Sequence, residues 1–161
     1  LSEHDRRHIE ALGGVQDIVI TNSDHVRGAA ELSAASGARV WGPPLELDRL
    51  GHLEAHAASD GQQPIAGLEV FELHGSKTPG ELALLIEHHT LVVGDLVRGQ
   101  RAGRLNLLPD AKLADRVAAL QSLRRLTELG GVDAVLVGDG WPVFHGGRHA
   151  LNALLIELEG P

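Results

Sequence analysis

The sequence predicts an α/β fold, and three observations point to it. The chain has 161 residues, of which 43% are hydrophobic, and we expect residues 1–161 to form a single domain with a buried core. Short apolar runs that stop at Gly or Pro alternate with stretches of helical spacing. Between residues 17 and 41 a strand, a helix and a second strand follow one another, which is the order of a β-α-β unit.

Capping and stop signals define the elements of the first half. Ser2 and Asp5 are spaced like an N-cap and its N3 partner, and Gly13-Gly14 would end that helix. The predicted elements are a helix over 2–12, a strand over 17–21, a helix over 26–36, a strand over 38–41 and a mixture of helix and loop over 45–63.

Periodicity defines the second half. Residues 68–73 alternate apolar and polar side chains, as a half-buried strand does, and residues 82–87 and 90–93 flank His88-His89 like the arms of a hairpin. Helical spacing over 114–129 stops at Gly130-Gly131, residues 134–138 form the last strand, and residues 147–158 have the apolar spacing of a terminal helix.

Composition narrows the possible partners and location. A net charge of -8, with no obvious stretch of Lys and Arg, disfavours nucleic acid as a partner. No apolar run approaches the length of a membrane span and no secretory leader is visible, so we expect a cytoplasmic protein that does not bind membranes. The chain begins with Leu1 and contains no Met, so we also expect that some N-terminal sequence has been removed.

Three predicted strands end in an acidic residue. Asp24-His25 follows the strand at 17–21, Asp95 follows Leu91-Val-Val-Gly, and Asp139 follows Val135-Leu-Val-Gly. Three carboxylates brought together repel one another unless a cation, a lysine or protons neutralise them, so the pattern indicates a metal site. Because the chain has no Cys, the ligands would be His, Asp and Glu. The alternatives are that Asp24 caps the following helix, the favoured interpretation of that residue alone, and that Asp95 and Asp139 are turn residues.

Three pairs of histidines have four-residue spacing, which places two imidazoles on one face of a helix. None matches a known zinc-binding helix motif, and we interpret most of them as solvated surface. The pairs are His4/His8, His52/His56 and His145/His149.

Four segments, in order along the chain, resemble the motifs of the metallo-β-lactamase fold superfamily, which includes glyoxalase II-like thioesterases. They are residues 18–29, 73–84, 91–96 and 135–140. The resemblance implies an αββα sandwich. That family has strands ahead of the first helix for which this chain has no room, so we expect an N-terminally incomplete domain or a first sheet that a partner completes.

The resemblance also implies which residues stand at the family's two metal positions. Asp24, His25 and Asp95 match second-site and bridging ligands, and Asp139 replaces the terminal His. All first-site histidines are missing: Lys77 matches one, and Ile20 with Asn22, or Asn22 alone, matches the leading pair. A site made of Asp24, His25, Asp95 and Asp139 would hold one divalent metal (Zn, Mn or Fe) or none, with Lys77 close enough to pair with Asp95.

Two functions follow from this degenerate site. In the first, the protein is a mononuclear metal-dependent hydrolase of ester, thioester or phosphoester bonds, with Asp24 and Lys77 as catalytic residues and Lys77 stabilising the oxyanion. Its partner would be a small-molecule substrate. In the second, Lys77 replaces the metal charge in a salt-bridge cluster with the three Asp residues. The protein is then a non-catalytic binding or oligomerisation module, and a homo-oligomer is one form it could take.

Overall fold

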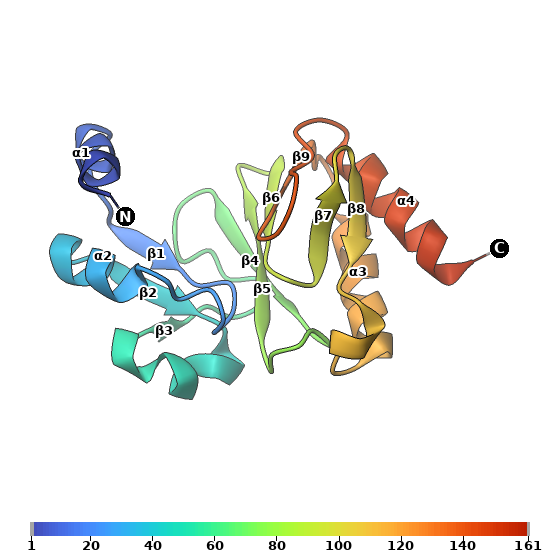
Figure 1. Cartoon of the computed structure of the whole chain (residues 1–161), viewed down its shortest axis with the longest axis horizontal. Helices are drawn as coiled ribbons and strands as arrows, with labels where there is room; N and C mark the ends of the chain where they lie inside the picture. Colours follow the sequence, from blue (N-terminus) through green and yellow to red (C-terminus); the bar gives the residue numbers. More distant parts are fainter. Residues whose placement is uncertain (1, 161) are drawn as a thin grey trace.

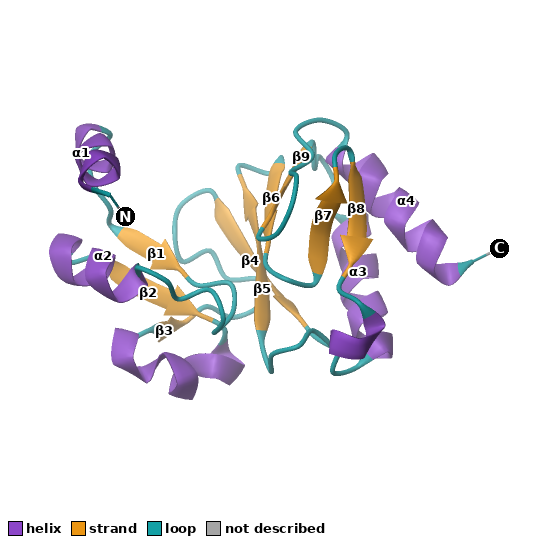
Figure 2. Cartoon of the chain, viewed as in Figure 1, coloured by secondary structure: helices purple, strands orange, loops and turns teal. Residues whose placement is uncertain are grey.

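Two larger β-sheets lie between two groups of helices in the computed structural model, which describes residues 2–160 (Figure 1), and a third sheet has only two strands. The helices α1, α2 and η1 lie on the side of the first sheet, and α3 and α4 lie on the side of the second (Figure 2). Separate apolar clusters fill the space outside each sheet and between the sheets. The arrangement is the αββα sandwich that the resemblance implies.

The first sheet is parallel, in the order β1-β2-β3. Ile20 and Val40 pack against Leu50 and Leu53 on its helix side. Its strands are β1 (Asp17–Val19), β2 (Arg39–Gly42) and β3 (His56–Ala57), and its helices are α1 (Glu3–Ala11), α2 (Ala29–Ser36) and the 3-10 helix η1 (Pro44–Leu53). The predicted β-α-β unit is confirmed, because β1 pairs with β2 in parallel, and so is the capping box of Ser2 and Asp5.

The second sheet has the order β4-β5-β6-β9. Its first three strands are antiparallel neighbours, and β9 joins β6 in parallel. The strands are β4 (Leu68–Leu73), β5 (Glu81–Ile86), β6 (Thr90–Val93) and β9 (Ala134–Val137), and the covering helices are α3 (Arg116–Glu128) and α4 (Gly147–Glu159). The largest core cluster packs α3 and α4 onto this sheet, and Leu91, Leu123 and Leu151 are fully buried in it.

The two sheets meet through Ala58, Val70, Leu82 and Leu84. A backbone hydrogen bond joins them near the site, where Leu82 N donates to Thr21 O over 2.8 Å. Because Thr21 follows β1 and Leu82 lies in β5, the carboxyl end of β1 is held against the start of β5. This junction positions the loops described below.

Two local features of the structure differ from the sequence prediction. No element was predicted for residues 97–110, which contain the antiparallel strands β7 (Val97–Arg101) and β8 (Arg104–Leu107), followed by the short 3-10 helix η2 (Asp110–Lys112). The first β-α-β helix begins at Ala29 rather than at residue 26, and its N-cap is Gly28 in a left-handed conformation. Asp24 therefore does not cap it.

In the part of the chain that the structure describes, no helix combines the length and the apolar character needed to span a membrane.

Candidate functional site

Four side chains from three loops form an ion-pair cluster between the sheets, which we name the Lys77 cluster: Asp24, His25, Lys77 and Asp95. Asp24 and His25 follow β1, Lys77 precedes β5, and Asp95 follows β6. The Lys77 ammonium lies 2.7 Å from Asp24 Oδ2 and 3.0 Å from Asp95 Oδ2. The structure thus brings Asp24, His25, Lys77 and Asp95 together.

Asp95 is the buried centre of the cluster. Its side chain is only 5% exposed, and its Oδ2 also accepts a hydrogen bond from Asn22 Nδ2 at 3.1 Å. His25 Nε2 lies 3.4 Å from the same oxygen. Burial opposes ionisation of Asp95, but the nearby Lys77, His25 and Asn22 outweigh it and hold its pKa below the ordinary value. Asp95 is therefore a carboxylate at neutral pH.

Lys77 carries the positive charge that balances this carboxylate. The hydrogen bond to Asp24 raises the pKa of Lys77, burial opposes the rise, and the hydrogen bond to Asp95 adds to it. An ammonium of raised pKa stays protonated at neutral pH, so it is a poor nucleophile or base. Its chemical contribution is a fixed positive charge with N–H donors.

His25 is held at both ring nitrogens. Nδ1 lies 3.0 Å from Thr21 Oγ1, and Nε2 faces Asp95. A carboxylate only accepts, so a proton on Nε2 favours the contact with Asp95, and the Thr21 hydroxyl is able either to donate to Nδ1 or to accept from it. Gly138 supplies the space for the ring, because a Cβ at that position would lie 3.0 Å from His25 Cε1. This close approach explains why β9 is followed by Gly.

Asp139 does not join the Lys77 cluster. Its carboxylate pairs instead with the guanidinium of Arg98 from β7, and within residues 2–160 no hydrogen bond or ion pair links it to Lys77. The expectation of a salt-bridge cluster of Lys77 with all three Asp residues is therefore corrected to two. The physical reason is the parallel bridge between Gly99 and Gly140, which brings Arg98 beside Asp139.

Glu46 is a structural member of the site that sequence reasoning missed. It lies in η1 and is fully buried, where its carboxylate accepts from Ser23 N and, at 2.9 Å, from Gly80 N. Ser23 precedes Asp24, and Gly80 ends the loop that carries Lys77. Glu46 thus connects the two loops that present the opposite charges of the cluster.

Glu81 holds the loop after β6, which carries Asp95, through a hydrogen bond to Leu96 N. It is fully buried, its Oε1 accepts from Leu96 N at 2.8 Å, and its Oε2 accepts from Ser76 Oγ at 2.6 Å. Burial raises the pKa of Glu81, with Asp95 adding to the rise and the hydrogen bonds opposing it. Gly94 leaves room for it, because a Cβ there would lie 3.0 Å from Glu81 Oε1.

A Glu81→Gln variant is expected to be more stable than the wild type at neutral pH. A buried acid whose folded pKa is raised favours folding below that pKa and loses this contribution as the pH rises through it. Gln removes the buried charge and keeps a carbonyl oxygen for Leu96 N. The check is urea denaturation from pH 5 to 8, in which the advantage of the variant should grow with pH. A lower stability of the variant throughout would contradict the prediction.

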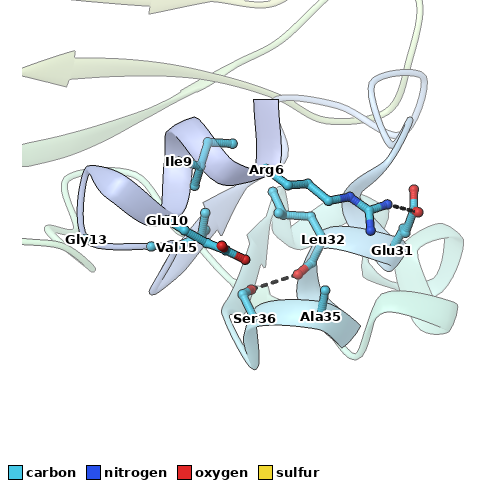
Figure 3. A pocket seen from close by; sticks show the side chains of 10 residues that line it. Arg6, Ile9, Glu10, Gly13, Val15, Glu31, Leu32, Ala35 and Ser36 are labelled. Carbon is cyan, nitrogen blue, oxygen red and sulfur yellow. Dashed lines mark hydrogen bonds and ion pairs between the residues drawn. The ribbon is translucent and has the colours of Figure 1, made fainter. Parts of the chain in front are cut away.

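A hollow between α1 and α2 lies apart from the Lys77 cluster. It has a volume of about 290 Å³ and lies between α1 and α2 (Figure 3). Ile9, Val15 and Leu32 line it, and the ion pair of Arg6 with Glu31 crosses its edge. None of the four cluster residues belongs to its lining.

The donor set does not fit a metal ion in the arrangement described. Among residues 2–160, no three His, Asp or Glu side chains are grouped so that they could hold one. The Lys77 ammonium lies between two of the expected ligands, and Arg98 engages the fourth, Asp139. Asn22, which stands at a leading His position of the resemblance, is buried and donates to Asp95.

The αββα architecture and the position of this cluster at the ends of strands are those implied by the resemblance to the metallo-β-lactamase fold superfamily. The sequence profile described as "Metallo-beta-lactamase superfamily" matches residues 1–158. The chain therefore belongs to the metallo-β-lactamase superfamily, as the resemblance indicated. A comparison with curated proteins gives no match.

Solved structures of the superfamily share this fold. TTHA1623 in a di-iron-bound form is 25% identical, with a TM-score of 0.71 over 92% of this chain and 81% of that one. A metallo-β-lactamase from Pontibacter korlensis is 21% identical, with a TM-score of 0.68 over 99% and 77%. The mono-zinc form of FIM-1 from Pseudomonas aeruginosa is 11% identical, with a TM-score of 0.66 over 98% and 74%.

Proposed function

We propose that this protein works without a bound metal, and that Lys77 replaces the metal charge in a superfamily member that serves as a binding module rather than as a metal-dependent hydrolase. The observation that carries the proposal is the position of the Lys77 ammonium, 2.7 Å from Asp24 and 3.0 Å from Asp95. An ammonium and a divalent cation compete for the same carboxylate oxygens, so a paired Lys77 lowers the affinity of the site for metal.

The surrounding contacts support a preformed, metal-free cluster. Asp95 Oδ2 contacts Lys77, Asn22 and His25, and the side-chain oxygen Oδ1 of Asn22 accepts from Asp24 N at 3.0 Å. The side chain of Asp24 remains half exposed and that of Lys77 about a third exposed, at 50% and 32%. The cluster thus has a buried base and a solvent-facing rim, as a binding site requires.

The test is the metal content of the purified protein, measured by elemental mass spectrometry beside an Asp95→Ala variant. We expect far less than one metal per chain in both proteins, also after incubation with Mn²⁺, Fe²⁺ and Zn²⁺. Close to one metal per wild-type chain that is lost in Asp95→Ala would overturn the proposal, because a charge-replacing lysine leaves no affinity for a stoichiometric ion.

A second candidate function is a mononuclear hydrolase of ester, thioester or phosphoester bonds that uses Asp24, His25, Asp95 and Asp139 as ligands. The observation in its favour is that three of these four side chains already converge, with His25 Nε2 3.4 Å from Asp95 Oδ2. TTHA1623 is known in a di-iron-bound form and FIM-1 in a mono-zinc form. In this chain the candidate requires Lys77 to leave its two carboxylates and Asp139 to leave Arg98.

A further inference from the structure

Two arginines face each other at the tip of the β7–β8 hairpin. Arg101 and Arg104 are directly paired across the strands, and both are exposed. Like charges in directly opposite positions destabilise a hairpin. Arg104 has an acidic partner in Glu157 of α4, at 3.1 Å, whereas none of the ion pairs among residues 2–160 includes Arg101. The free protein therefore holds an uncompensated positive charge at this tip.

The β7–β8 hairpin and α4 lie side by side (Figure 1). Two adjoining hollows lie between them, and the arginines belong to their lining. One hollow, of about 260 Å³, is lined by both arginines with Gln100 and Asn106. The other, of about 340 Å³, is lined by Arg104 with His145 and His149. Arg104, buried Leu105 and Glu157 line both hollows, and we refer to the two adjoining hollows together as the groove.

We propose that this groove binds a small molecule that carries an oxyanion group, either phosphate or carboxylate. Guanidinium groups bind such anions through paired charge-assisted hydrogen bonds. The guanidinium of Arg101 and the side-chain amide of Gln100 supply donors, and the guanidinium of Arg104 lies beside them, shared with Glu157. Buried Leu105 supplies an apolar base. The volumes are those of a small-molecule site rather than of a protein interface.

The charges that face the groove are consistent with an anionic ligand. Glu157 is its acidic lining residue and is paired with Arg104. Asp133 contacts the groove through His145, whose Nδ1 lies 3.0 Å from Asp133 Oδ2, and through Gly146, whose N donates to Asp133 Oδ1 at 2.9 Å. Arg101 is thus left as the charge that an anion would neutralise. The inference goes beyond the proposed function, because none of the residues of the Lys77 cluster lines this groove.

The experiment is an NMR titration of the full chain with inorganic phosphate and, separately, with citrate, at constant ionic strength. We expect saturable shifts of the amide resonances of residues 100–106 with at least one of the two anions. In Arg101→Gln the affinity should fall about tenfold, since a charge-assisted pair is lost. The matched control is Arg116→Gln, which removes an exposed arginine that pairs with Asp110 elsewhere and should leave the affinity unchanged.

The thermal stability of the same variant gives an independent measurement. Without anion, Arg101→Gln should melt at the wild-type temperature or about 1 to 2 °C higher, because a like-charge pair is removed. Equal anion affinity in Arg101→Gln and wild type, or no saturable shift with either anion, would overturn the inference. A clear fall in melting temperature would also overturn it, because Arg101 would then be a structural residue. Metal content has no part in these measurements, so they can fail independently of the proposed function.

Discussion

Replacing Glu46 by Ala is expected to lower the free energy of unfolding by about 3 to 5 kcal/mol. The change leaves the N–H groups of Ser23 and Gly80 without their acceptor, and an unsatisfied buried donor costs about 1 to 3 kcal/mol. It also opens a cavity where a fully buried side chain stood. Urea denaturation followed by circular dichroism measures the difference.

Two variants separate this connecting role from a general effect of altering η1. Asp48→Ala changes an exposed acid of the same 3-10 helix and is expected to alter stability by no more than about 0.5 kcal/mol. Glu46→Gln keeps one acceptor oxygen and should lose about half as much as Glu46→Ala. If Glu46→Ala were as stable as Asp48→Ala, Glu46 would not hold the two loops together.

The role of Glu46 illustrates what local sequence does not reveal. Its sequence signal is a position between Leu45 and Leu47, after Pro43-Pro44, and this pattern does not distinguish a buried acid from an exposed one. The carboxylate is buried because its two hydrogen-bond donors come from residues 23 and 80, far away in the chain. Such long-range partners are a property of the fold.

Whether a strand was predicted also depended on local pattern: β4 was predicted from its own sequence, and β7 was not. Residues 68–73 alternate apolar and polar side chains except at Val70-Phe71, and β4 has the predicted bounds. Strand β7 reads Val-Arg-Gly-Gln-Arg, which has no such period. It is positioned by tertiary contact, since Gly99 N donates to Asp139 O at 3.0 Å and Trp141 N donates to Gly99 O. The local sequence pattern therefore identified the strands and helices whose apolar side chains recur with the period of the element.

In the candidate site, too, some residues were predicted from the sequence and one contact was not. Asp24, His25, Lys77 and Asp95 were predicted because motif order placed them at the ends of neighbouring strands. The partner of Asp139 was not predicted, because Arg98 lies in the strand that sequence reasoning missed. Whether a metal binds among these residues stays a prediction to be tested by metal content.

Lys77→Met is expected to lower the free energy of unfolding by about 1 to 3 kcal/mol at pH 7. The variant leaves Asp95, 5% exposed, without its ammonium partner, and breaking a fully buried ion pair costs about 3 to 5 kcal/mol. The smaller value is expected because solvent reaches Lys77 and Asp24, exposed by 32% and 50%. Met keeps the length of the side chain, so loss of charge dominates.

The difference between variant and wild type should shrink in acid. Pairing with Lys77 helps to hold the pKa of Asp95 below its ordinary value, so the stabilisation is present above the unfolded pKa of about 3.9 and is lost as the pH falls through the lower folded value. Urea denaturation at pH 7 and about pH 3 measures this. Lys112→Met, an exposed lysine of η2, is the matched control and should show no such pH-dependent difference.

Metal addition then tests whether Lys77 stands in for a cation. Without the ammonium, Asp24, His25 and Asp95 keep oxygen and imidazole donors around an uncompensated charge, so Mn²⁺ or Zn²⁺ should raise the melting temperature of Lys77→Met but leave the wild type and Lys112→Met unchanged. Equal stabilisation of the wild type and Lys77→Met by metal would contradict charge replacement. It would show that the ammonium and the ion do not compete, because a ligand can shift an equilibrium only by its differential affinity for the two states.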